Sequence, residues 1–345
     1  MFDNNEMLRG PELLPRVAAR ILYRLPDSDL RARLLYRYRE NQFYGHLARR
    51  LGNAFTPVDP GPVAPPELIV QTAVLREADV PRSVDAFEYV SSSYMGVLSF
   101  LHALERCGFN LRTVGSILDF GCGTGINIRL LRSIEGVRLV GTDVNSQLIE
   151  WCRRNIPGVQ FHLNELEPPL GFAEDDSFDL VLAASVFTHI PLRWQNPWLE
   201  EIRRVMRPAA FLVCTVAGPY HMEAQLSPEQ RAILYAQGEI ELTAESPGAS
   251  LATKNTGLWD VFQTRARVVE AFGRVFGICD FVATGGQHML VLQKPVAAGR
   301  LHDRSRLRHA AGERPGPKVA GSPNSYRGDR LAEVGDELAR RGRER

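Results

Sequence analysis

Two hydrophobic patterns alternate along the chain between residues 116 and 216. Short apolar runs, typical of buried strands, are separated by stretches whose apolar residues recur every three or four positions, as on one face of a helix. Strands are predicted at 116–120, 138–142, 159–163, 178–183 and 210–216, and helices at 125–133, 146–155 and 194–206. Strands that alternate with helices indicate a doubly wound α/β fold, with a parallel sheet covered on both faces.

Further helices and strands are predicted on both sides of this stretch. A helix is predicted over 84–107, where Gly108 follows it, and a further helix is predicted over 263–272. Strands at 276–283 and 288–293 complete the sheet. Residues 217–258 break the rhythm with Gly, Pro and polar residues around a helical stretch near 228–237. We interpret 217–258 as an insertion on the substrate side of the domain.

The two ends of the chain have a different character. Residues 11–52 show helical spacing with many arginines, and 56–66 hold five prolines, which favours a linker. Beyond Pro295 the chain is rich in Gly, Pro and Arg, and is predicted to be disordered apart from a short terminal helix. We therefore divide the chain into a helical extension with its linker (1–66), a central domain (67–296) and a tail (297–345).

Composition limits the class of protein. An apolar fraction of 44% supplies a large core, and no run approaches the length of a membrane span. The first residues lack the apolar segment of a secretory signal. The five cysteines show no CxxC spacing, which favours a reducing, cytoplasmic location and disfavours a metal site. The Arg-rich tail lacks the interleaved aromatic residues that nucleic-acid stacking uses, so nucleic-acid binding is not expected.

The amphipathic stretch at 11–52 leaves several roles open. A basic amphipathic helix pair is able to lie on an anionic membrane surface or to bind a partner. We favour a helical cap on the domain or a dimer contact. The sequence does not fix the oligomeric state.

A glycine-rich turn follows the first strand of the predicted sheet. Asp119 ends the strand, and Gly121, Gly123 and Gly125 come next, where a cofactor lying against the backbone would collide with any Cβ atom. The dinucleotide fingerprint GxGxxG requires a glycine where this chain has Ile126. An acid before the glycines suits a cofactor with a cationic amino-acid end better than a pyrophosphate. Asp143, at the end of the second strand, is placed to accept both hydroxyls of a ribose.

Five segments in order resemble class I S-adenosylmethionine-dependent methyltransferases, as in a methyltransferase type 11/12-like domain. The first is Ile-Leu-Asp-Phe-Gly-Cys-Gly-Thr-Gly at 117–125, similar to the family's motif I. The others are Gly-Thr-Asp-Val-Asn (141–145), Phe-His-Leu-Asn-Glu (161–165), Ser-Phe-Asp-Leu-Val with Ser-Val-Phe-Thr-His-Ile (177–190), and the helix ending in Met-Arg-Pro (199–208). Two positions depart from the family pattern, because Ala209-Ala210 replaces Gly-Gly and Glu165 replaces the usual Asp. The resemblance covers about 84–295 and concerns the cofactor, not the acceptor.

The resemblance implies a Rossmann-like, seven-stranded, mostly parallel sheet with S-adenosylmethionine as cofactor. It implies that Asp119 and the loop glycines hold the methionine portion, that Asp143 holds the ribose, and that Glu165 with Leu166 faces the adenine. The full set of expected cofactor residues is Asp119, Phe120, Gly121, Cys122, Gly123, Gly125, Asp143, Val144, Glu165, Leu166 and Ser185.

Methyl transfer needs a general base only where the acceptor is a weakly acidic hydroxyl. His189, in the loop after the fourth strand, is the first candidate for that base, and His221, at the start of the insertion, is the second. Both histidines also have a structural interpretation, as hydrogen-bonding groups within their loops.

We expect methyl transfer to a small molecule, such as a hydroxyl of a sugar, glycan or secondary metabolite. The alternatives are an NAD(P)-dependent oxidoreductase on a similar sheet and a non-catalytic S-adenosylmethionine-binding protein. The stretch Ala-Ser-Val-Phe (184–187) lacks the Asn-Pro-Pro-aromatic signature common in amide and base methylation. The sequence leaves the acceptor open.

Overall fold

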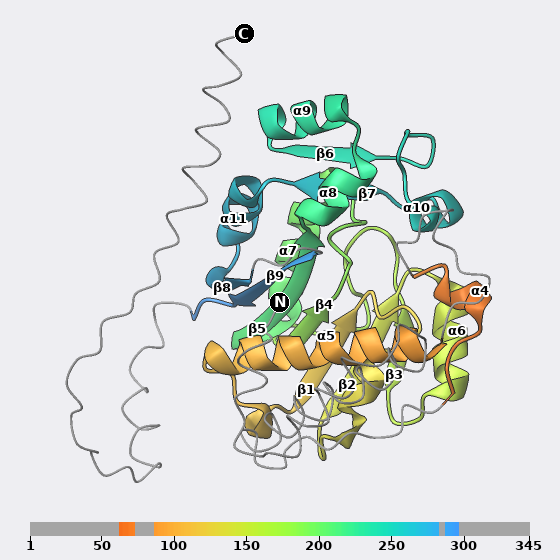
Figure 1. Cartoon of the computed structure of the whole chain (residues 1–345). Helices are drawn as coiled ribbons and strands as arrows, with labels where there is room; N and C mark the ends of the chain where they lie inside the picture. Colours follow the sequence, from red (N-terminus) through yellow and green to blue (C-terminus); the bar gives the residue numbers. More distant parts are fainter. Residues whose placement is uncertain (1–61, 73–85, 283–286, 297–345) are drawn as a thin grey trace, which may run out of the picture. The chain divides into compact units, whose positions relative to one another are not determined.

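The computed structural model describes residues 62–72, 86–282 and 287–296 (Figure 1). The predicted helices within 11–52, most of the proline-rich linker and the whole of 297–345 lie outside these residues. Within the described part, no helix is long and apolar enough to cross a membrane.

A seven-stranded sheet with the order β3-β2-β1-β4-β5-β9-β8 forms the centre of the domain (Figure 1). Its strands are β1 (Ser116–Phe120), β2 (Arg138–Asp143), β3 (Gln160–Leu163), β4 (Phe178–Ala183), β5 (Met206–Ala217), β8 (Gly277–Val282) and β9 (Gln287–Gln293). β9 runs antiparallel to both of its neighbours, and the pairs from β3 to β5 are parallel. The predicted doubly wound α/β fold is confirmed.

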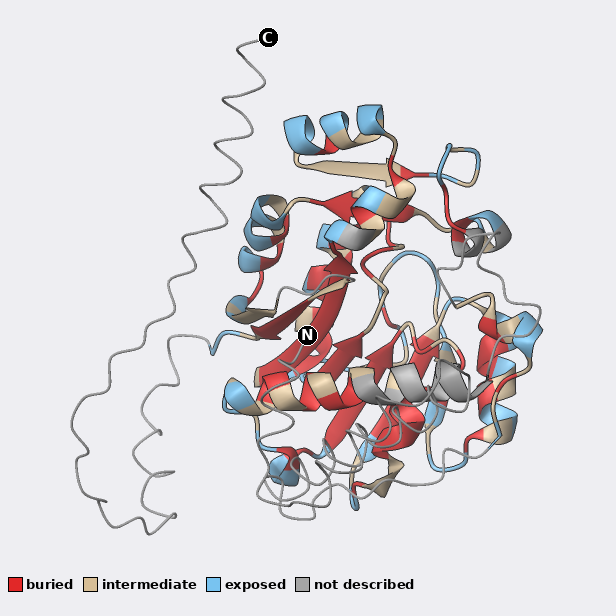
Figure 2. Cartoon of the chain, in the orientation of Figure 1, coloured by how far each residue is buried: buried red, intermediate tan, exposed pale blue. Residues whose placement is uncertain are grey.

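Helices cover both faces of the sheet. Outside the insertion, the described helices are α4 (Pro66–Ile69), α5 (Ala86–Arg106), η2 (Leu111–Thr113), η3 (Ile128–Ser133), α6 (Ser146–Asn155), α7 (Leu192–Val205) and α11 (Arg265–Gly273). Side chains of α5, η3 and α6 pack with Ile117 in one core cluster, whereas α7 and α11 pack with Leu118 in the other. Successive residues of a strand point to opposite faces, so β1 is buried along its whole length (Figure 2).

The segment after the glycine turn differs from its prediction. A helix was expected over 125–133, but the chain forms a series of turns through Asn127 and then a short 3-10 helix, η3. Gly121, Gly123 and Gly125 all have positive φ, which is incompatible with a right-handed helix. Helical bonding therefore begins late, and the side chain of the N-cap residue Asn127 makes no capping hydrogen bond.

The insertion is more regular than the sequence suggested. It contains α8 (Pro219–Gln225), α9 (Pro228–Gln237), β6 (Glu239–Leu242) and α10 (Leu251–Thr256), and β6 pairs antiparallel with β7 (Asp260–Gln263). The start of the helix predicted at 263–272 is corrected, because Thr264 caps α11 and Gln263 belongs to β7. These strands are too short for a clear alternating pattern.

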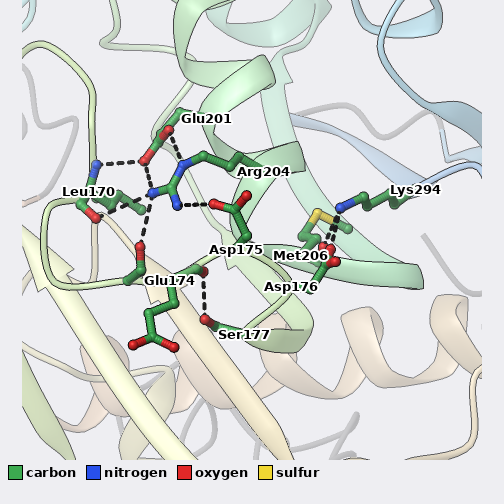
Figure 3. Close-up of polar contacts among 10 residues, drawn as sticks. Leu170, Glu174, Asp175, Asp176, Ser177, Glu201, Arg204, Met206 and Lys294 are labelled. Atoms are coloured by element: carbon green, nitrogen blue, oxygen red, sulfur yellow. Dashed lines mark hydrogen bonds and ion pairs between the residues drawn. The ribbon is translucent and has the colours of Figure 1, made fainter.

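A polar cluster around Arg204 fixes the loop before β4 onto α7 (Figure 3). Arg204 donates to both carboxylate oxygens of Glu201 and to Asp175, and Glu201 also accepts from the backbone N–H of Leu170 at 2.7 Å. Arg204 holds the pKa of the Glu201 carboxyl below its usual value. The cluster lies away from the carboxyl ends of the strands and stabilises the fold.

Candidate active site

A cavity of about 1120 Å³ opens at the carboxyl ends of the parallel strands. Its walls come from the segment 67–72, from α5, from the loops after β1, β2, β3 and β4, and from β5, β9 and the end of α10. Parallel α/β sheets bind ligands at this edge. Among the described residues, no group of three or more His, Cys, Asp or Glu side chains is arranged to hold a metal ion.

The glycine turn forms one wall of the cavity. Gly121 has φ +69°, and a Cβ atom added there would lie 2.5 Å from Cγ2 of Val186. Gly123 has φ +54°, and its added Cβ would lie 2.9 Å from Cγ2 of Thr72. Both positions therefore require glycine for backbone conformation and for space. Phe120 and Cys122 also line this wall, whereas Gly125 packs behind it.

Asp143 lies at the end of β2 and lines the cavity. One carboxylate oxygen accepts the N–H of Gly123 at 2.8 Å, and the other accepts the N–H of Asn145 at 2.9 Å. Burial raises the pKa of Asp143, although these backbone hydrogen bonds oppose the effect. Each oxygen has a second lone pair, so the carboxylate holds the glycine turn and still has acceptor capacity toward the cavity.

Asp119 lies beneath the turn and is not part of the cavity wall. Its side chain is fully buried, and one oxygen accepts the N–H of Ile128 at 3.2 Å. Within the described part of the chain, its other oxygen has no hydrogen-bond partner. Burial raises the pKa of Asp119 to about 7, and the nearby charge of Asp143 adds to this effect.

The wall formed by the ends of β2 and β3 is partly apolar. Val144 and Leu166 line it, and Leu166 is 48% exposed. The Leu166 carbonyl accepts the indole N–H of Trp198 at 2.9 Å, which fixes the backbone at this point. Glu165 is not among the lining residues, whereas the neighbouring Asn164 is.

A segment from before α5 crosses the glycine turn. Thr72 contacts the position of Gly123, and the side chain of Gln71 accepts from the Asn145 amide at 2.6 Å. The guanidinium of Arg129 donates to the Pro62 carbonyl at 2.6 Å. Residues 62–72, which we name the covering segment, therefore close one side of the cavity.

Polar side chains meet where β4, β5 and β9 border the cavity. The hydroxyls of Ser185 and Thr215 both donate to Oε1 of Gln287, at 2.9 and 2.6 Å. The N–H of Ser185 donates to Oγ1 of Thr215 at 2.7 Å. Ser185 has φ +59°, a left-handed conformation that a non-glycine residue adopts at some cost and that is frequent at functional sites.

His189 lines the same end of the cavity. Its Nδ1 lies 2.8 Å from the carbonyl oxygen of Trp259 and 3.6 Å from Oδ1 of Asp260. A carbonyl oxygen only accepts hydrogen bonds, so Nδ1 carries the proton and Nε2 has the free lone pair in the neutral ring. Burial lowers the pKa of His189, although Asp260 raises it.

The second predicted base, His221, lies at a different position. It belongs to α8 and borders a small void of about 10 Å³ that it shares with His189, Asp260 and Gln287, but it does not line the main cavity. Its proximity contributes to the lowered pKa of His189.

Comparison with known families agrees with this geometry. Residues 117–209 match the model of a family described as a methyltransferase domain. Residues 117–209 therefore carry a methyltransferase domain, in agreement with the family that the sequence resembles. S-Adenosylmethionine is the methyl donor that the sequence predicts for this domain.

Several solved methyltransferase structures are similar to this domain. One, from Methanosarcina mazei, is 20% identical, covers 53% of this chain and 93% of its own, and has a TM-score of 0.41. Another, from Mesorhizobium loti, is 13% identical over 52% of this chain and 91% of its own, with a TM-score of 0.40. A Burkholderia thailandensis 1,6-didemethyltoxoflavin-N1-methyltransferase with bound 1,6-didemethyltoxoflavin and S-adenosylhomocysteine is 17% identical, over 70% of this chain and 94% of its own (TM-score 0.39).

Four residues that line the methyltransferase cavity were missed by sequence reasoning. Gln71 follows a proline-rich stretch that reads as a linker, and Asn164 was passed over for its neighbour Glu165. Thr215 lies inside a strand that was predicted as core, and Gln287 begins β9, one position before the strand predicted at 288–293. Only the fold brings these polar side chains together, so no local pattern could have identified them.

Proposed function

We propose that this methyltransferase transfers a methyl group from S-adenosylmethionine to a hydroxyl of a small-molecule acceptor, with His189 as general base. The hydrogen bond from Nδ1 of His189 to the Trp259 carbonyl carries the proposal. It orients the ring and leaves Nε2 unprotonated, while burial keeps the imidazole neutral near pH 7. A neutral imidazole at the cavity wall is suited to take a proton from a hydroxyl.

The residues of the cavity fit the cofactor. We propose that the turn of Gly121 and Gly123 with Phe120 and Cys122 holds the methionine portion, because a Cβ atom at either glycine has no space. Bound there, S-adenosylmethionine supplies an electrophilic methyl carbon. Asp119 and Gly125 support the turn from beneath.

The opposite wall suits the nucleoside. Asp143 offers carboxylate lone pairs to the ribose hydroxyls, with Val144 beside it. Leu166 offers an exposed apolar surface to the adenine. We keep Glu165 as a candidate for the adenine amine, and Asn164 is the polar neighbour that lines the cavity.

The polar group of Ser185, Thr215 and Gln287 lies at the end of the cavity that holds His189. The Ser185 hydroxyl gives its proton to Gln287, so its lone pairs are left to accept from a ligand. This arrangement suits a hydroxyl-bearing, uncharged acceptor. Small-molecule sites commonly measure about 300–1,000 Å³, and a cavity of about 1120 Å³ suits a cofactor together with an acceptor.

We also propose that residues 67–296 form the methyltransferase domain and that 217–258 cover its acceptor side. Glu67 and Met289, near the two ends of this range, both line the cavity. Thr256 and Gly257, at the end of the insertion, line it as well. A cytoplasmic location and a membrane or partner contact through 11–52 remain predictions.

Transfer of label from [methyl-¹³C]S-adenosylmethionine to a panel of sugars, glycans and phenolic metabolites tests the function. His189→Asn should bind S-adenosylhomocysteine as tightly as the wild type and lose about 10²–10⁴-fold in methyl transfer, the usual contribution of a general base. His162→Asn is the matched control, because His162 stacks on Phe172 and does not line the cavity.

The pH dependence of the wild type gives a second readout. Because burial lowers the pKa of His189, kcat/KM should rise with pH, with its midpoint below the usual histidine value of 6.5. Full activity of His189→Asn on every acceptor that the wild type methylates contradicts the base role.

A further inference from the structure

The segment that immediately follows the insertion contacts the loop that carries His189 at two backbone positions. The N–H of Val261, in β7, donates to the Thr188 carbonyl at 2.8 Å. The carbonyl of Trp259, just before β7, accepts from Nδ1 of His189 at 2.8 Å. Asp260 lies between these two contacts in the sequence, so the hairpin of β6 and β7 holds a carboxylate beside the imidazole.

Asp260 is itself rigidly held. Only 3% of the residue is exposed, its Oδ2 accepts the N–H of Ser250 at 2.6 Å, and its Oδ1 accepts the Ser250 hydroxyl at 2.8 Å. The same Oδ1 lies 3.6 Å from Nδ1 of His189, too far for a hydrogen bond and close enough for a strong charge interaction. The buried carboxylate therefore acts on His189 through its charge.

Among the described residues, Asp260 and His221 are the charged or titratable groups that face His189 from the elements packed against it. Asp260, on β7, favours the protonated ring, and His221, on α8, disfavours it. A histidine that takes a proton in a buried site becomes a cation, which is costly unless a negative group lies nearby. Asp260 is placed to lower that cost at the moment when the proton arrives.

We propose that Asp260 is a positioning residue that stabilises the His189 imidazolium formed during methyl transfer, so that the β6–β7 hairpin supplies part of the base. The inference rests on the proposed function. As the acceptor oxygen forms its bond to the methyl carbon and the carbon–sulfur bond breaks, the hydroxyl proton moves to Nε2. The sulfur leaves as a neutral thioether with the bonding electron pair, and the proton passes from His189 to solvent afterwards.

Imidazole NMR of the full-length protein tests this role without any acceptor. The His189 signal, identified by its loss in His189→Asn, is titrated in the presence of S-adenosylhomocysteine. Asp260→Asn keeps the shape of the side chain and removes its charge, so the pKa of His189 should fall by roughly one unit. Glu239→Gln is the matched control, because it removes a carboxylate of the same hairpin that pairs with Arg267 instead, and it should leave this pKa unchanged.

Ser250→Ala should shift the pKa of His189 in the opposite direction. It also provides a second test in case Asp260→Asn does not fold. It removes the hydroxyl that donates to the oxygen facing His189, so the carboxylate attracts the imidazolium more strongly and the pKa of His189 should rise. A pKa of His189 that is the same in the wild type and in each folded variant of Asp260 and Ser250 overturns the proposal.

Methyl-transfer rates distinguish a failure of this inference from a failure of the proposed function. With the acceptor from the labelling panel, Asp260→Asn should lower kcat about tenfold or more, with the KM for S-adenosylmethionine unchanged. If His189→Asn retains full activity, the proposed function and the Asp260 role both fail. If His189→Asn is inactive while Asp260→Asn has wild-type kcat and an unshifted His189 pKa, only the role of Asp260 fails.

Discussion

Gly121 and Gly136 show two different reasons for a glycine: the backbone conformation, and the lack of space for a side chain. Both have positive φ, but a Cβ atom at Gly121 meets Val186, whereas a Cβ at Gly136 has nothing within 4 Å. Gly136→Ala should destabilise the fold by about 1–2 kcal/mol, the cost of the left-handed backbone. Gly121→Ala should add about 1–3 kcal/mol for the collision, and should weaken S-adenosylhomocysteine binding at least tenfold. Urea unfolding and calorimetry measure these losses, and equal losses for the two variants contradict the packing argument.

The raised pKa of Asp119 predicts that the stability of the fold depends on pH. Its pKa in the folded protein is about 7, above the value of 3.8 expected for a free side chain. Both states are protonated below about pH 4, so the carboxyl weakens the fold only as the pH rises toward 7. The wild type should therefore lose up to roughly 4 kcal/mol relative to Asp119→Asn across this range, at about 1.4 kcal/mol per unit.

Unfolding of both proteins in urea at pH 4, 6 and 8, without cofactor, measures this difference. Carboxyls remote from Asp119 titrate equally in the two proteins and cancel, whereas the coupling of Asp119 to Asp143 is part of the measured difference. A wild-type-minus-variant difference that does not change with pH rules out the burial of Asp119 as its cause.

The elements with strong periodicity were predictable from the sequence, because one physical rule governs them. β1 and β4 are mostly apolar because both of their faces are buried, and α6 has an Asn145 cap followed by apolar residues at helical spacing. η3 was taken for an α-helix because its apolar residues fit either winding. β6 and β7 were missed because strands of four residues show too little alternation to be recognised.

The covering segment is an element whose contribution can be measured. Gln71 joins it to Asn145, beside the carboxylate of Asp143. Gln71→Ala removes this hydrogen bond, which is worth about 1 kcal/mol, and should weaken S-adenosylhomocysteine binding about fivefold, mainly through faster release. Gln160→Ala, on an exposed position of β3, is the control. Stopped-flow release rates that are equal for both variants and the wild type contradict a closing role.

At the scale of the whole molecule, the cofactor should stabilise the fold by mass action. S-Adenosylhomocysteine at 100 times its Kd adds about 2.7 kcal/mol to the free energy of unfolding. For a domain of this size, that corresponds to a rise in Tm of roughly 5–10 °C. NADH at the same concentration should leave Tm unchanged, and differential scanning fluorimetry compares the two. Stabilisation by NADH alone contradicts the assignment of the glycine turn to a sulfonium cofactor.

The site was predictable where one local segment forms it and not where distant segments meet. The glycine turn and Asp143 were recognised because residue type and spacing specify them. His189 was identified by its place after the fourth strand, but its partners Trp259 and Asp260 were not, because about seventy residues separate them from it. The sequence also gave no sign that Asp119 lies behind the turn instead of in the cavity wall.

The walls of the cavity have a practical consequence for any attempt to isolate the enzyme's minimal unit. The recognisable family segment ends at residue 209, whereas the lining extends from Glu67 to Met289. A fragment cut at the family boundaries would keep the glycine turn and His189 and lose β9, the covering segment and the hairpin beside the imidazole. The cavity of this fragment would be open on one side, and its catalytic residues would be exposed to bulk water. The segment that matches the family model is therefore shorter than the part of the chain that forms the complete cavity.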